Sequence, residues 1–332
     1  MVSPLLESTS MERIWNSNNS STDKNVRFFI KIDAVQPSGS FKIRGVGHLC
    51  QDLVLRQKFK KLVCASGGNA GLATVYAARQ LNVPCVIVLP HSTPPIVKER
   101  MYELYPGGVE VVLHGKVWDE ANAYAKQLIS EQNAGYVHPF DDPMLWEGHA
   151  SIIEEIQQQL GITEMPDVII TVVGGGGLLK GVCEGIQRIG WNPPQKPVQV
   201  VAVETKGADS FNAAVAAGKL VTLPDITSIA KTLGAKTVCS AAFDCAKTFA
   251  VTSLVVEDKA AVKACLQFAN DHRILVEPSC GCGISLVYDH NPILKELISM
   301  SDKPNPIVVV IVCGGSGVDM QMLEAWKKQF QL

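Results

Sequence analysis

Short runs of β-branched and other apolar residues alternate along the chain with stretches that have helical periodicity. One run, KKLVCASGG, ends in a glycine-rich turn and leads into NAGLATVYAARQL, and a second, VIITVVGGGG, leads into LLKGVCEGIQRIG. Alternation of this kind favours parallel sheets covered by helices. Further runs of the same character predict strands, namely FFIKID, PCVIVLP, VEVVLHG, VQVVAVE and PIVVVIVCGG. These strands are too many for one small sheet.

The apolar runs between about residue 60 and residue 140 predict a compact open sheet of their own. They are LVCAS, PCVIVLP, VEVVLHG and the run near Tyr136. We therefore expect a small α/β domain, residues 46–144, inserted into a larger domain made of residues 1–45 and 145–332. The segment PLLESTSMERIW predicts the start of a helix, and the polar stretch WNSNNSSTDKN at residues 15–25 predicts a surface loop.

The composition is that of a globular protein, and the balance of charges indicates which partners are not expected. Hydrophobic residues make up 47% and charged residues 19% of the 332 residues, a proportion far from that of disordered chains. Thirty basic and 32 acidic residues give a net charge of −2, with no run of lysine and arginine. We therefore expect no nucleic-acid partner.

Neither a targeting segment nor a membrane span is expected. The N-terminal MVSPLLESTSMERIW contains no basic stretch followed by an apolar core, and no segment approaches about 18 uninterrupted apolar residues. The sequence thus predicts a cytoplasmic protein, in which the N-x-S sequons at Asn18 and Asn19 would have no role.

The ten cysteines are scattered singly through this chain, mostly in apolar runs, so no disulfide framework is expected. The pair Cys280 and Cys282 is separated by one glycine. That spacing lacks the C-x-x-C pattern and the second pair of a structural zinc site, so we expect no zinc there.

The glycine run Gly174–Gly177 follows the apolar strand VIITVV and opens a helix. Unhindered backbone N–H groups and the positive end of the helix would converge there, which is typical of a phosphate cradle. The spacing fits neither the dinucleotide fingerprint nor the Walker A motif. A purely structural glycine turn is the alternative interpretation.

Two other strand-to-helix junctions also offer polar groups. The segment from Ser66 to Gly71, with the sequence SGGNAG, presents N–H donors and the amide of Asn69, which could hold a carboxylate and a ring hydroxyl. At VCGGSG, the thiol of Cys313 ends a buried strand, where open parallel sheets contact their ligands. Taken alone, Cys313 would be interpreted as an ordinary core thiol.

Lys42, in SGSFKIRG, is flanked by small residues and follows a predicted strand. By itself it would be interpreted as a solvated surface lysine. The other junctions change that interpretation, because a lysine, a phosphate cradle, a carboxylate-binding turn and a neutral group at a strand end are the parts that a pyridoxal phosphate site requires.

Six motifs lie in order across residues 37–316: PSGSFKIRG, SGGNAG, PFDDPMLWEGHAS, VGGGGLL, LVEPSCG and VIVCGGS. In these the chain resembles the fold-type-II pyridoxal phosphate enzymes, and among them the animal-type L-serine/L-threonine dehydratases and their serine-dehydratase-like relatives. The resemblance implies an α/β fold like that of the tryptophan synthase β subunit. That fold has two open, twisted, mostly parallel sheets with helices on both faces.

The resemblance also implies a role for individual residues. Lys42 would bind pyridoxal phosphate as a Schiff base, with Phe41 on one face of the ring and Ala230 on the other, and Cys313 would face the ring nitrogen. The cofactor phosphate would be bound by Gly174, Gly175, Gly176, Gly177 and Leu178. The ring 3-oxygen would be bound by Asn69, and the substrate carboxylate by Ser66, Gly67, Asn69 and Ala70. A monovalent cation such as K+ would be bound by Glu204 and the backbone near Ala208 and Gly234.

The reaction implied by the resemblance is β-elimination from L-serine or L-threonine, giving ammonia with pyruvate or 2-oxobutyrate. Lys42, freed from the cofactor by the substrate amine, would take the α-proton. A neutral thiol at Cys313 leaves the ring nitrogen unprotonated, which favours elimination over transamination. A homodimer is also implied, and we expect no isoleucine-binding regulatory domain after the last strand.

Three other functions stay open: serine racemisation, which requires a second acid/base residue; β-replacement, which requires a nucleophilic second substrate; and a weakly active cofactor-binding homologue that serves in interactions. One departure concerns efficiency. Where some dehydratases have S-x-A-G-N, this chain has Ser66-Gly67-Gly68-Asn69. Because glycine enlarges the space beside the substrate and loosens the turn, we expect a lower turnover than in the alanine form.

Overall fold

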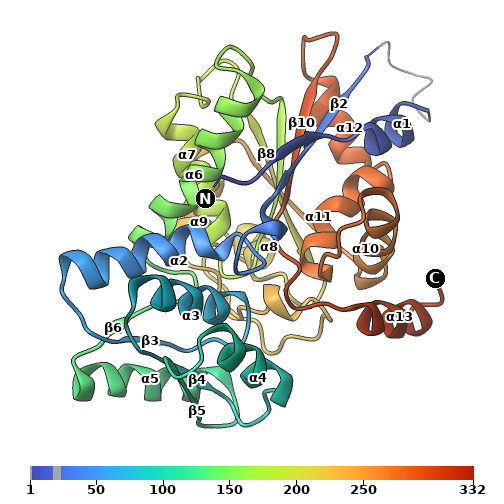
Figure 1. Cartoon of the computed structure of the whole chain (residues 1–332). Coiled ribbons are helices and arrows are strands. Elements are labelled where there is room, and N and C mark those ends of the chain that lie inside the picture. Colours follow the sequence, from blue (N-terminus) through green and yellow to red (C-terminus); the bar gives the residue numbers. More distant parts are fainter. Residues whose placement is uncertain (1, 18–23) are drawn as a thin grey trace. The chain divides into compact units, whose positions relative to one another are not determined.

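The computed structural model describes residues 2–17 and 24–332 (Figure 1). The chain divides into two compact units, one made of residues 1–35 and 150–332 and the other of residues 36–149. The domain limits predicted above, with an insert at residues 46–144, stay a proposal. The sequons at Asn18 and Asn19 lie outside the described residues. In the described part of the chain, no helix is both long and apolar enough to cross a membrane.

The unit of residues 36–149 contains a four-stranded parallel sheet in the order β5-β4-β3-β6. Its strands are β3 (Leu62–Cys64), β4 (Cys85–Leu89), β5 (Val109–Leu113) and β6 (Gly135–Tyr136). Its helices are α2 (Lys42–Gln51), η2 (Asp52–Arg56), α3 (Asn69–Leu81), α4 (Pro95–Leu104), α5 (Trp118–Gln132) and the first part of α6 (Pro143–Leu160). The prediction that these four runs form a sheet of their own is confirmed.

Alternate residues of these strands are buried on opposite faces of the sheet, as the two-residue period of a strand requires. Leu62 and Cys64 of β3 belong to a core that includes residues of α2, α3 and α4. Val63, between them, belongs to a second core with Ala121 and Ala125 of α5. Burial on both faces explains why β3 and β4 are continuous apolar runs in the sequence.

The other unit contains a six-stranded sheet in the order β1-β2-β10-β7-β8-β9, parallel except for β1. Its strands are β1 (Leu5–Glu7), β2 (Arg27–Ile32), β7 (Val168–Val172), β8 (Gln199–Thr205), β9 (Val251–Val256) and β10 (Ile307–Val312). Its helices, with the last part of α6, are α1 (Thr9–Ser17), η1 (Asp33–Val35), α7 (Gly177–Arg188), α8 (Ser210–Ala217), η3 (Lys231–Leu233), α9 (Ser240–Thr248), α10 (Asp258–His272), α11 (Pro278–Tyr288), α12 (Pro292–Ser299) and α13 (Met320–Gln329).

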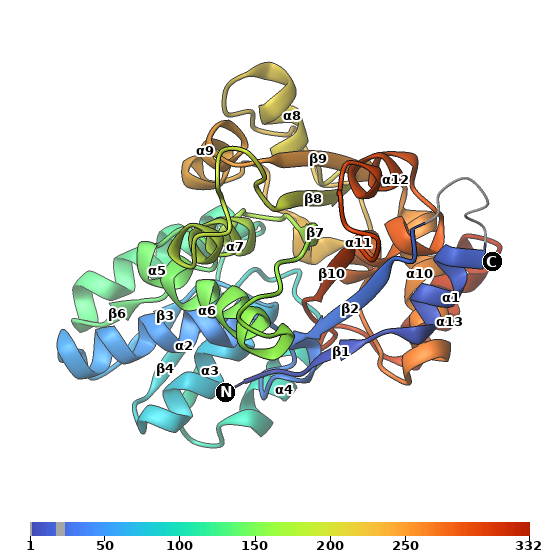
Figure 2. The same ribbon diagram turned by 90° about the horizontal axis from the view of Figure 1, so that it is seen from above.

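The strand order reverses between β10 and β7. From β7 the chain continues to β8 and β9 on one side, whereas β10 comes last and lies on the other side of β7. Helices α7 and α9 lie on one face of this sheet and α10 and α11 on the other (Figure 2). In open α/β sheets, ligands bind at the carboxyl ends of the strands beside such a reversal.

Of the two expectations about the N-terminal segment, one is confirmed and one is partly wrong. The stretch PLLESTSMERIW contains the start of a helix, at Thr9, although it begins with strand β1. Residues 15–17, expected in a loop, belong to α1, where Trp15 is fully buried. Trp15 packs on Phe28 with ring centroids 5.5 Å apart, so burial of the indole extends the helix into the polar stretch.

A buried lysine ties the N-terminal segment to the large sheet. The Lys31 Nζ of β2 donates hydrogen bonds to the Ser3 carbonyl oxygen at 2.6 Å, to Glu155 Oε2 at 2.6 Å and to Gln159 Oε1 at 2.8 Å. Ser3 Oγ in turn donates to Asp33 Oδ1 at 2.5 Å. A fully buried ammonium requires such partners, and here they hold β1 at the sheet edge.

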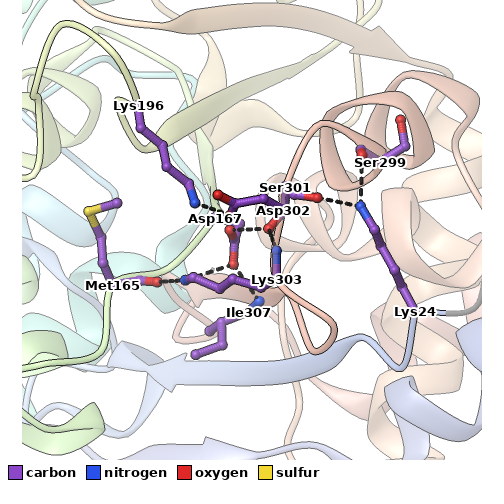
Figure 3. A network of polar contacts seen from close by, with 9 residues as sticks. All are labelled: Lys24, Met165, Asp167, Lys196, Ser299, Ser301, Asp302, Lys303 and Ile307. Atoms are coloured by element: carbon purple, nitrogen blue, oxygen red, sulfur yellow. Dashed lines mark hydrogen bonds and ion pairs between the residues drawn. The ribbon is translucent and has the colours of Figure 1, made fainter.

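A second polar network, shown in Figure 3, lies where β7 and β10 begin. The Asp167 carboxylate accepts hydrogen bonds from Ser301 Oγ at 2.6 Å and the Ile307 N–H at 2.8 Å, and it pairs with Lys303 Nζ at 3.1 Å. Lys24 Nζ donates to the carbonyl oxygens of Ser299 and Ser301. These contacts lie at the opposite end of the strands from Gly174 and Cys313, so we assign them to stability.

Replacing Asp167 by alanine is expected to lower the free energy of unfolding by about 3 kcal/mol. The nearly buried Asp167 carboxylate is the acceptor for the Ser301 hydroxyl and the Ile307 N–H and the counter-ion of the partly buried Lys303 ammonium, and all three lose it. Asp302→Ala is the matched control. It removes an ion pair of Asp302 with Lys196 in the same network, but the Asp302 side chain is 78% exposed, so a much smaller loss of stability is expected. Urea denaturation of both variants measures the difference, and equal losses would contradict the assignment.

Candidate functional site

Lys42 is the first residue of α2. Its Nζ donates a hydrogen bond to the Pro139 carbonyl oxygen at 2.6 Å and lies 5.1 Å from the centroid of the Phe41 ring. Phe41 is buried and is the N-cap residue of α2. Lys42, predicted to bind the cofactor, thus contacts a carbonyl oxygen and an aromatic ring.

The loop that follows β6 is shaped to present the Pro139 carbonyl. His138 Nδ1 accepts hydrogen bonds from the N–H groups of Phe140 at 3.2 Å and Asp141 at 2.8 Å. Trp146 Nε1 donates to the Phe140 carbonyl oxygen at 2.9 Å. Burial lowers the pKa of His138 to about 4, and the charges of nearby lysines act in the same direction, so the imidazole stays neutral and able to accept.

The SGGNAG segment follows β3, the strand beside β6. Because β3 and β6 are parallel, their carboxyl ends lie at one edge of the sheet. Lys42 lies at this edge too, since its Nζ donates to the carbonyl oxygen of Pro139, which follows β6. The charge of Lys42 also acts on Cys64, the last residue of β3: burial raises the pKa of that thiol to about 11, and the ammonium opposes the rise. Lys42 and the SGGNAG segment are therefore brought together.

Within this segment, Asn69 begins α3 and is nearly buried, and the first turn has no side-chain cap. Ser66 Oγ accepts a hydrogen bond from the Gly68 N–H at 3.3 Å. A Cβ on Gly71 would lie 1.9 Å from the Ser66 carbonyl oxygen, so the turn folds back against the helix. The first N–H groups of α3, with Ala70, form a donor set of the kind that binds a carboxylate.

In the other unit, Gly174, Gly175 and Gly176 connect β7 to α7, as predicted for a phosphate cradle. The first helical hydrogen bond runs from the Lys180 N–H to the Gly176 carbonyl oxygen at 2.9 Å. The N–H groups of Gly177, Leu178 and Leu179 precede it, and no side chain caps the helix. These N–H groups and the positive helix end can hold an anion.

The packing of this glycine loop leaves no space for side chains. Gly176 has φ +94°, and a Cβ there would lie 2.4 Å from the Cβ of Ala242. A Cβ on Gly174 would lie 3.0 Å from the Cα of Leu233. The Cys239 N–H donates to the Gly175 carbonyl oxygen at 3.0 Å. The loop is thus fixed by two neighbouring segments.

Cys313 follows β10 and is almost fully buried. Since β10 and β7 are parallel neighbours, Cys313 lies at the same edge as the glycine loop. A hydrogen bond with Cys280 of α11, and then burial, raise the pKa of the Cys313 thiol well above its usual value, and the charge of Glu277 acts in the same direction. The thiol is therefore neutral at physiological pH. All ten cysteines are free thiols.

Ala230 begins the segment of η3 that packs on Gly174. Its N–H donates to Ser228 Oγ at 2.9 Å, and Ser228 Oγ donates to Asp258 Oδ1 at 2.6 Å. Two residues on, Thr232 Oγ1 lies 3.1 Å from Glu277 Oε2. This segment is therefore anchored to both α10 and α11.

Glu204, expected to bind a cation, is fully buried in β8 and has protein partners. Its carboxylate oxygens accept hydrogen bonds from the N–H groups of Phe211 at 2.9 Å and Asn212 at 2.7 Å. Burial raises the pKa of Glu204 to about 8, although these hydrogen bonds oppose the rise. Ala208, which follows Glu204 closely in the sequence, is also buried. Gly234 lies at the end of η3.

The structure therefore brings the expected residues together in two sets, each within its own unit. Lys42 and Phe41 lie with Ser66–Ala70 in one unit, and Gly174–Leu178 lies with Ala230 and Cys313 in the other. Sequence reasoning missed His138, Pro139 and Cys280. Pro139 is the first residue of the motif PFDDPMLWEGHAS, and His138 precedes it. A signal was available, since both follow the run near Tyr136, which was predicted to lie in the same sheet as the strand before SGGNAG.

Comparison with known proteins gives a consistent result. The family model described as "Pyridoxal-phosphate dependent enzyme" matches residues 6–314. The chain is 46% identical to the human protein named "Serine dehydratase-like" over 98% of this chain and 94% of the relative. It is 47% identical to the human "L-serine dehydratase/L-threonine deaminase" over 91% of this chain and 89% of the relative.

Among solved structures, the chain is similar to a fungal L-serine ammonia-lyase from Rhizomucor miehei. The TM-score is 0.87 at 33% sequence identity, and the match covers 99% of this chain and 98% of the fungal chain. The likeness therefore extends through nearly all of both chains.

Proposed function

Because the chain belongs to the family of pyridoxal-phosphate-dependent enzymes, we propose that it is an L-serine/L-threonine ammonia-lyase that forms pyruvate or 2-oxobutyrate and ammonia. The observation that carries the reaction type is the buried, neutral thiol of Cys313 at the end of β10. A neutral group facing the ring nitrogen suits β-elimination, whereas a carboxylate would favour transamination. The names of the relatives at 46% and 47% identity support the same substrates.

The residues present fit pyridoxal phosphate. The glycine loop offers uncapped N–H groups to a phosphate, and Cys313 offers an uncharged partner to a pyridine nitrogen. Beside Lys42, the hydroxyl groups of Ser38 and Ser40 are buried and have no hydrogen-bond partner among the described residues. Buried polar groups are normally satisfied, so unpaired hydroxyls next to the lysine favour a polar ligand there.

In this proposal, Lys42 would hold the aldehyde of pyridoxal phosphate, the N–H groups of Gly174–Leu178 would hold its phosphate, and Asn69 would hold the ring oxygen. Phe41 and Ala230 would cover the two ring faces, and Cys313 would face the ring nitrogen.

Bound pyridoxal phosphate supplies an electron sink that makes the α-proton of an amino acid acidic. The remaining steps belong to the protein. Ser66, Gly67, Asn69 and Ala70 orient the substrate carboxylate. The free amine of Lys42 would accept the α-proton. The Pro139 carbonyl oxygen accepts a hydrogen bond from that amine and so fixes its direction.

Three further features are part of the proposal. A monovalent cation such as K+ binds at Glu204 with the backbone near Ala208, and a cation there would favour the ionised carboxylate that burial opposes. The enzyme is a homodimer. It acts in the cytoplasm.

The test is an assay of 2-oxo acid formation from L-serine and L-threonine with the cofactor-loaded enzyme, together with its visible absorbance. A colourless wild type that forms no 2-oxo acid contradicts the proposal. Chiral analysis of the remaining serine would reveal racemisation, and consumption of an added thiol would reveal β-replacement.

Gly67→Ala is expected to raise turnover several-fold, because a methyl group narrows the space beside the substrate carboxylate. A Cβ at this position would lie 3.4 Å from the Leu89 Cδ2 and 3.4 Å from the Thr93 Cγ2, which is ordinary contact. The same change should stabilise the fold by about 0.4–1 kcal/mol, since alanine restricts the unfolded chain. Steady-state rates with L-serine measure the effect.

Gly47→Ala in α2 is the control, since its Cβ would meet only Ile43 Cδ1, at 3.7 Å. It should stabilise the fold without raising turnover. An unchanged or slower Gly67→Ala enzyme would contradict the proposed role of Gly67.

A further inference from the structure

The first turn of α2 contacts a buried histidine that the proposed reaction does not use. His149 of α6 has no exposed surface and belongs to the same unit as Lys42. Its Nδ1 accepts a hydrogen bond from the Gly45 N–H at 3.2 Å. Gly45 lies in the turn that begins with Lys42, so this bond reaches the backbone that carries the lysine.

Helices α2 and α6 approach each other backbone to backbone at this point. A Cβ on Gly148 would lie 2.6 Å from the Arg44 carbonyl oxygen and 2.7 Å from the Gly45 Cα. A Cβ on Gly45 would lie 2.4 Å from the Leu145 carbonyl oxygen and 2.6 Å from the His149 Cε1. Neither glycine can carry a side chain without a shift of backbone, so the first turn of α2 has one arrangement against α6.

The imidazole of His149 is neutral and has a defined tautomer. Burial, with the positive charges of Lys42 and Arg44, lowers the pKa of His149 well below its usual value. Because Nδ1 accepts from Gly45, the ring proton is on Nε2. That nitrogen is buried and has no partner among the described residues. Gly45 is therefore the hydrogen-bonding partner that orients the ring.

The same ring packs on the residue that precedes Lys42. The centroids of His149 and Phe41 are 4.9 Å apart, with the planes inclined at 53°. Lys42 Nζ lies 5.1 Å from the centroid of the same Phe41 ring and donates a hydrogen bond to the Pro139 carbonyl oxygen. His149 thus contacts the Lys42 turn twice, through the Gly45 N–H and through Phe41.

We propose that His149 is a positioning residue for Lys42: its imidazole fixes the first turn of α2 and the Phe41 ring, and so directs the lysine amine. The inference rests on the proposed function, because it assigns the direction of the amine that binds the cofactor and accepts the α-proton. An ordinary core histidine would fill the same space without affecting that amine.

Two variants separate the two contacts. His149→Phe keeps an aromatic ring against Phe41 but removes the acceptor for the Gly45 N–H. His149→Asn places an amide oxygen near the position of Nδ1 but removes the ring. For each variant, kcat and KM with L-serine are measured on the cofactor-loaded enzyme. The fraction of cofactor that borohydride fixes covalently to Lys42 is measured by peptide mapping, and thermal unfolding is followed without cofactor.

We expect His149→Phe to lower kcat about 10- to 100-fold, as a small misplacement of a reacting group can do, with KM changed less than about threefold. The fraction fixed to Lys42 should fall as well. His149→Asn should recover part of both losses, because the Gly45 N–H regains an acceptor. His48→Gln is the matched control: His48 is a partly exposed histidine of α2, 3.6 Å from Glu147, and should change neither quantity.

A lowered unfolding temperature with unchanged kcat and unchanged fixation in His149→Phe would overturn the inference. If His149→Phe does not fold, His149→Asn becomes the test. This variant lacks the ring that contacts Phe41, so the inference requires its kcat to be at least a few-fold lower than that of the wild type. Either result differs from a failure of the proposed function, in which the wild type itself binds no cofactor and forms no 2-oxo acid.

Discussion

Lys42→Ala is expected to lower 2-oxo acid formation from L-serine about a thousand-fold and to abolish covalent attachment of the cofactor. The amine is the only group assigned both to bind the cofactor aldehyde and to accept the α-proton, and loss of a general base alone typically costs about 100- to 10,000-fold. Cofactor should still bind without a covalent bond, because the glycine loop of the other unit is unchanged. Visible absorbance and a coupled assay of pyruvate measure the two effects.

Lys61→Ala is the matched control for this prediction. Lys61 belongs to the same unit and lies beside β3, but its Nζ pairs with Gln132 in an exposed position at 2.8 Å. Its loss should change neither the absorbance nor the rate. A Lys42→Ala enzyme that keeps a tenth or more of the wild-type rate would exclude the assignment of Lys42.

Gly176→Ala is expected to weaken cofactor binding about 100-fold. Gly176 has φ +94°, and an added Cβ would lie 2.4 Å from the Ala242 Cβ and 2.9 Å from the Val238 Cγ2. Backbone strain of about 1–3 kcal/mol and the clash together must displace the loop, which moves the N–H groups of Gly177 and Leu178 away from the phosphate. A loss of about 2.8 kcal/mol in binding corresponds to a factor of about 100. Equilibrium titration of the cofactor-free enzyme measures the dissociation constant.

Gly190→Ala separates the effect on the loop from the effect of a strained backbone. Gly190 follows the other end of α7 with φ +80°, and a Cβ there would meet nothing within 4 Å. This variant should lose about 1 kcal/mol of stability and keep its cofactor affinity. Equal losses of affinity in both variants would show that helix stability, not loop geometry, controls binding.

Strands that are buried on both faces have the strongest pattern in the sequence. All residues of β7 and β10 are buried, so each is a continuous apolar run that no helix would share. The two missed strands lie at the edges of the large sheet. Strand β9 is only half-buried along its whole length, and β1 has three residues, so neither has a strong pattern. The end of α1 was missed for a different reason: burial of Trp15 extends this helix into a stretch whose local sequence is polar.

The candidate site residues could be proposed from the sequence in the same way as the buried strands, because each lies at a strand or helix end with a recognisable local sequence. Small residues around Lys42, four consecutive glycines before α7 and a thiol at the end of β10 are visible in the sequence. The residues that hold these groups could not be assigned that role from the sequence. His149 and Cys280 lie within the motifs PFDDPMLWEGHAS and LVEPSCG, but nothing in those motifs shows that His149 contacts the Lys42 turn or that Cys280 contacts Cys313.

By itself, the sequence determined the order of strands, glycine turns and helices, and with it the placement of Lys42, the glycine run and Cys313 at strand or helix ends. These features are local, since burial on both faces and the absence of side chains in a turn are properties of short segments. Only the tertiary structure decided which groups meet Lys42 and Cys313. The Pro139 carbonyl oxygen, the His149 ring and the Cys280 thiol come from distant parts of the chain, and their effects on direction and charge arise only when folding buries them together.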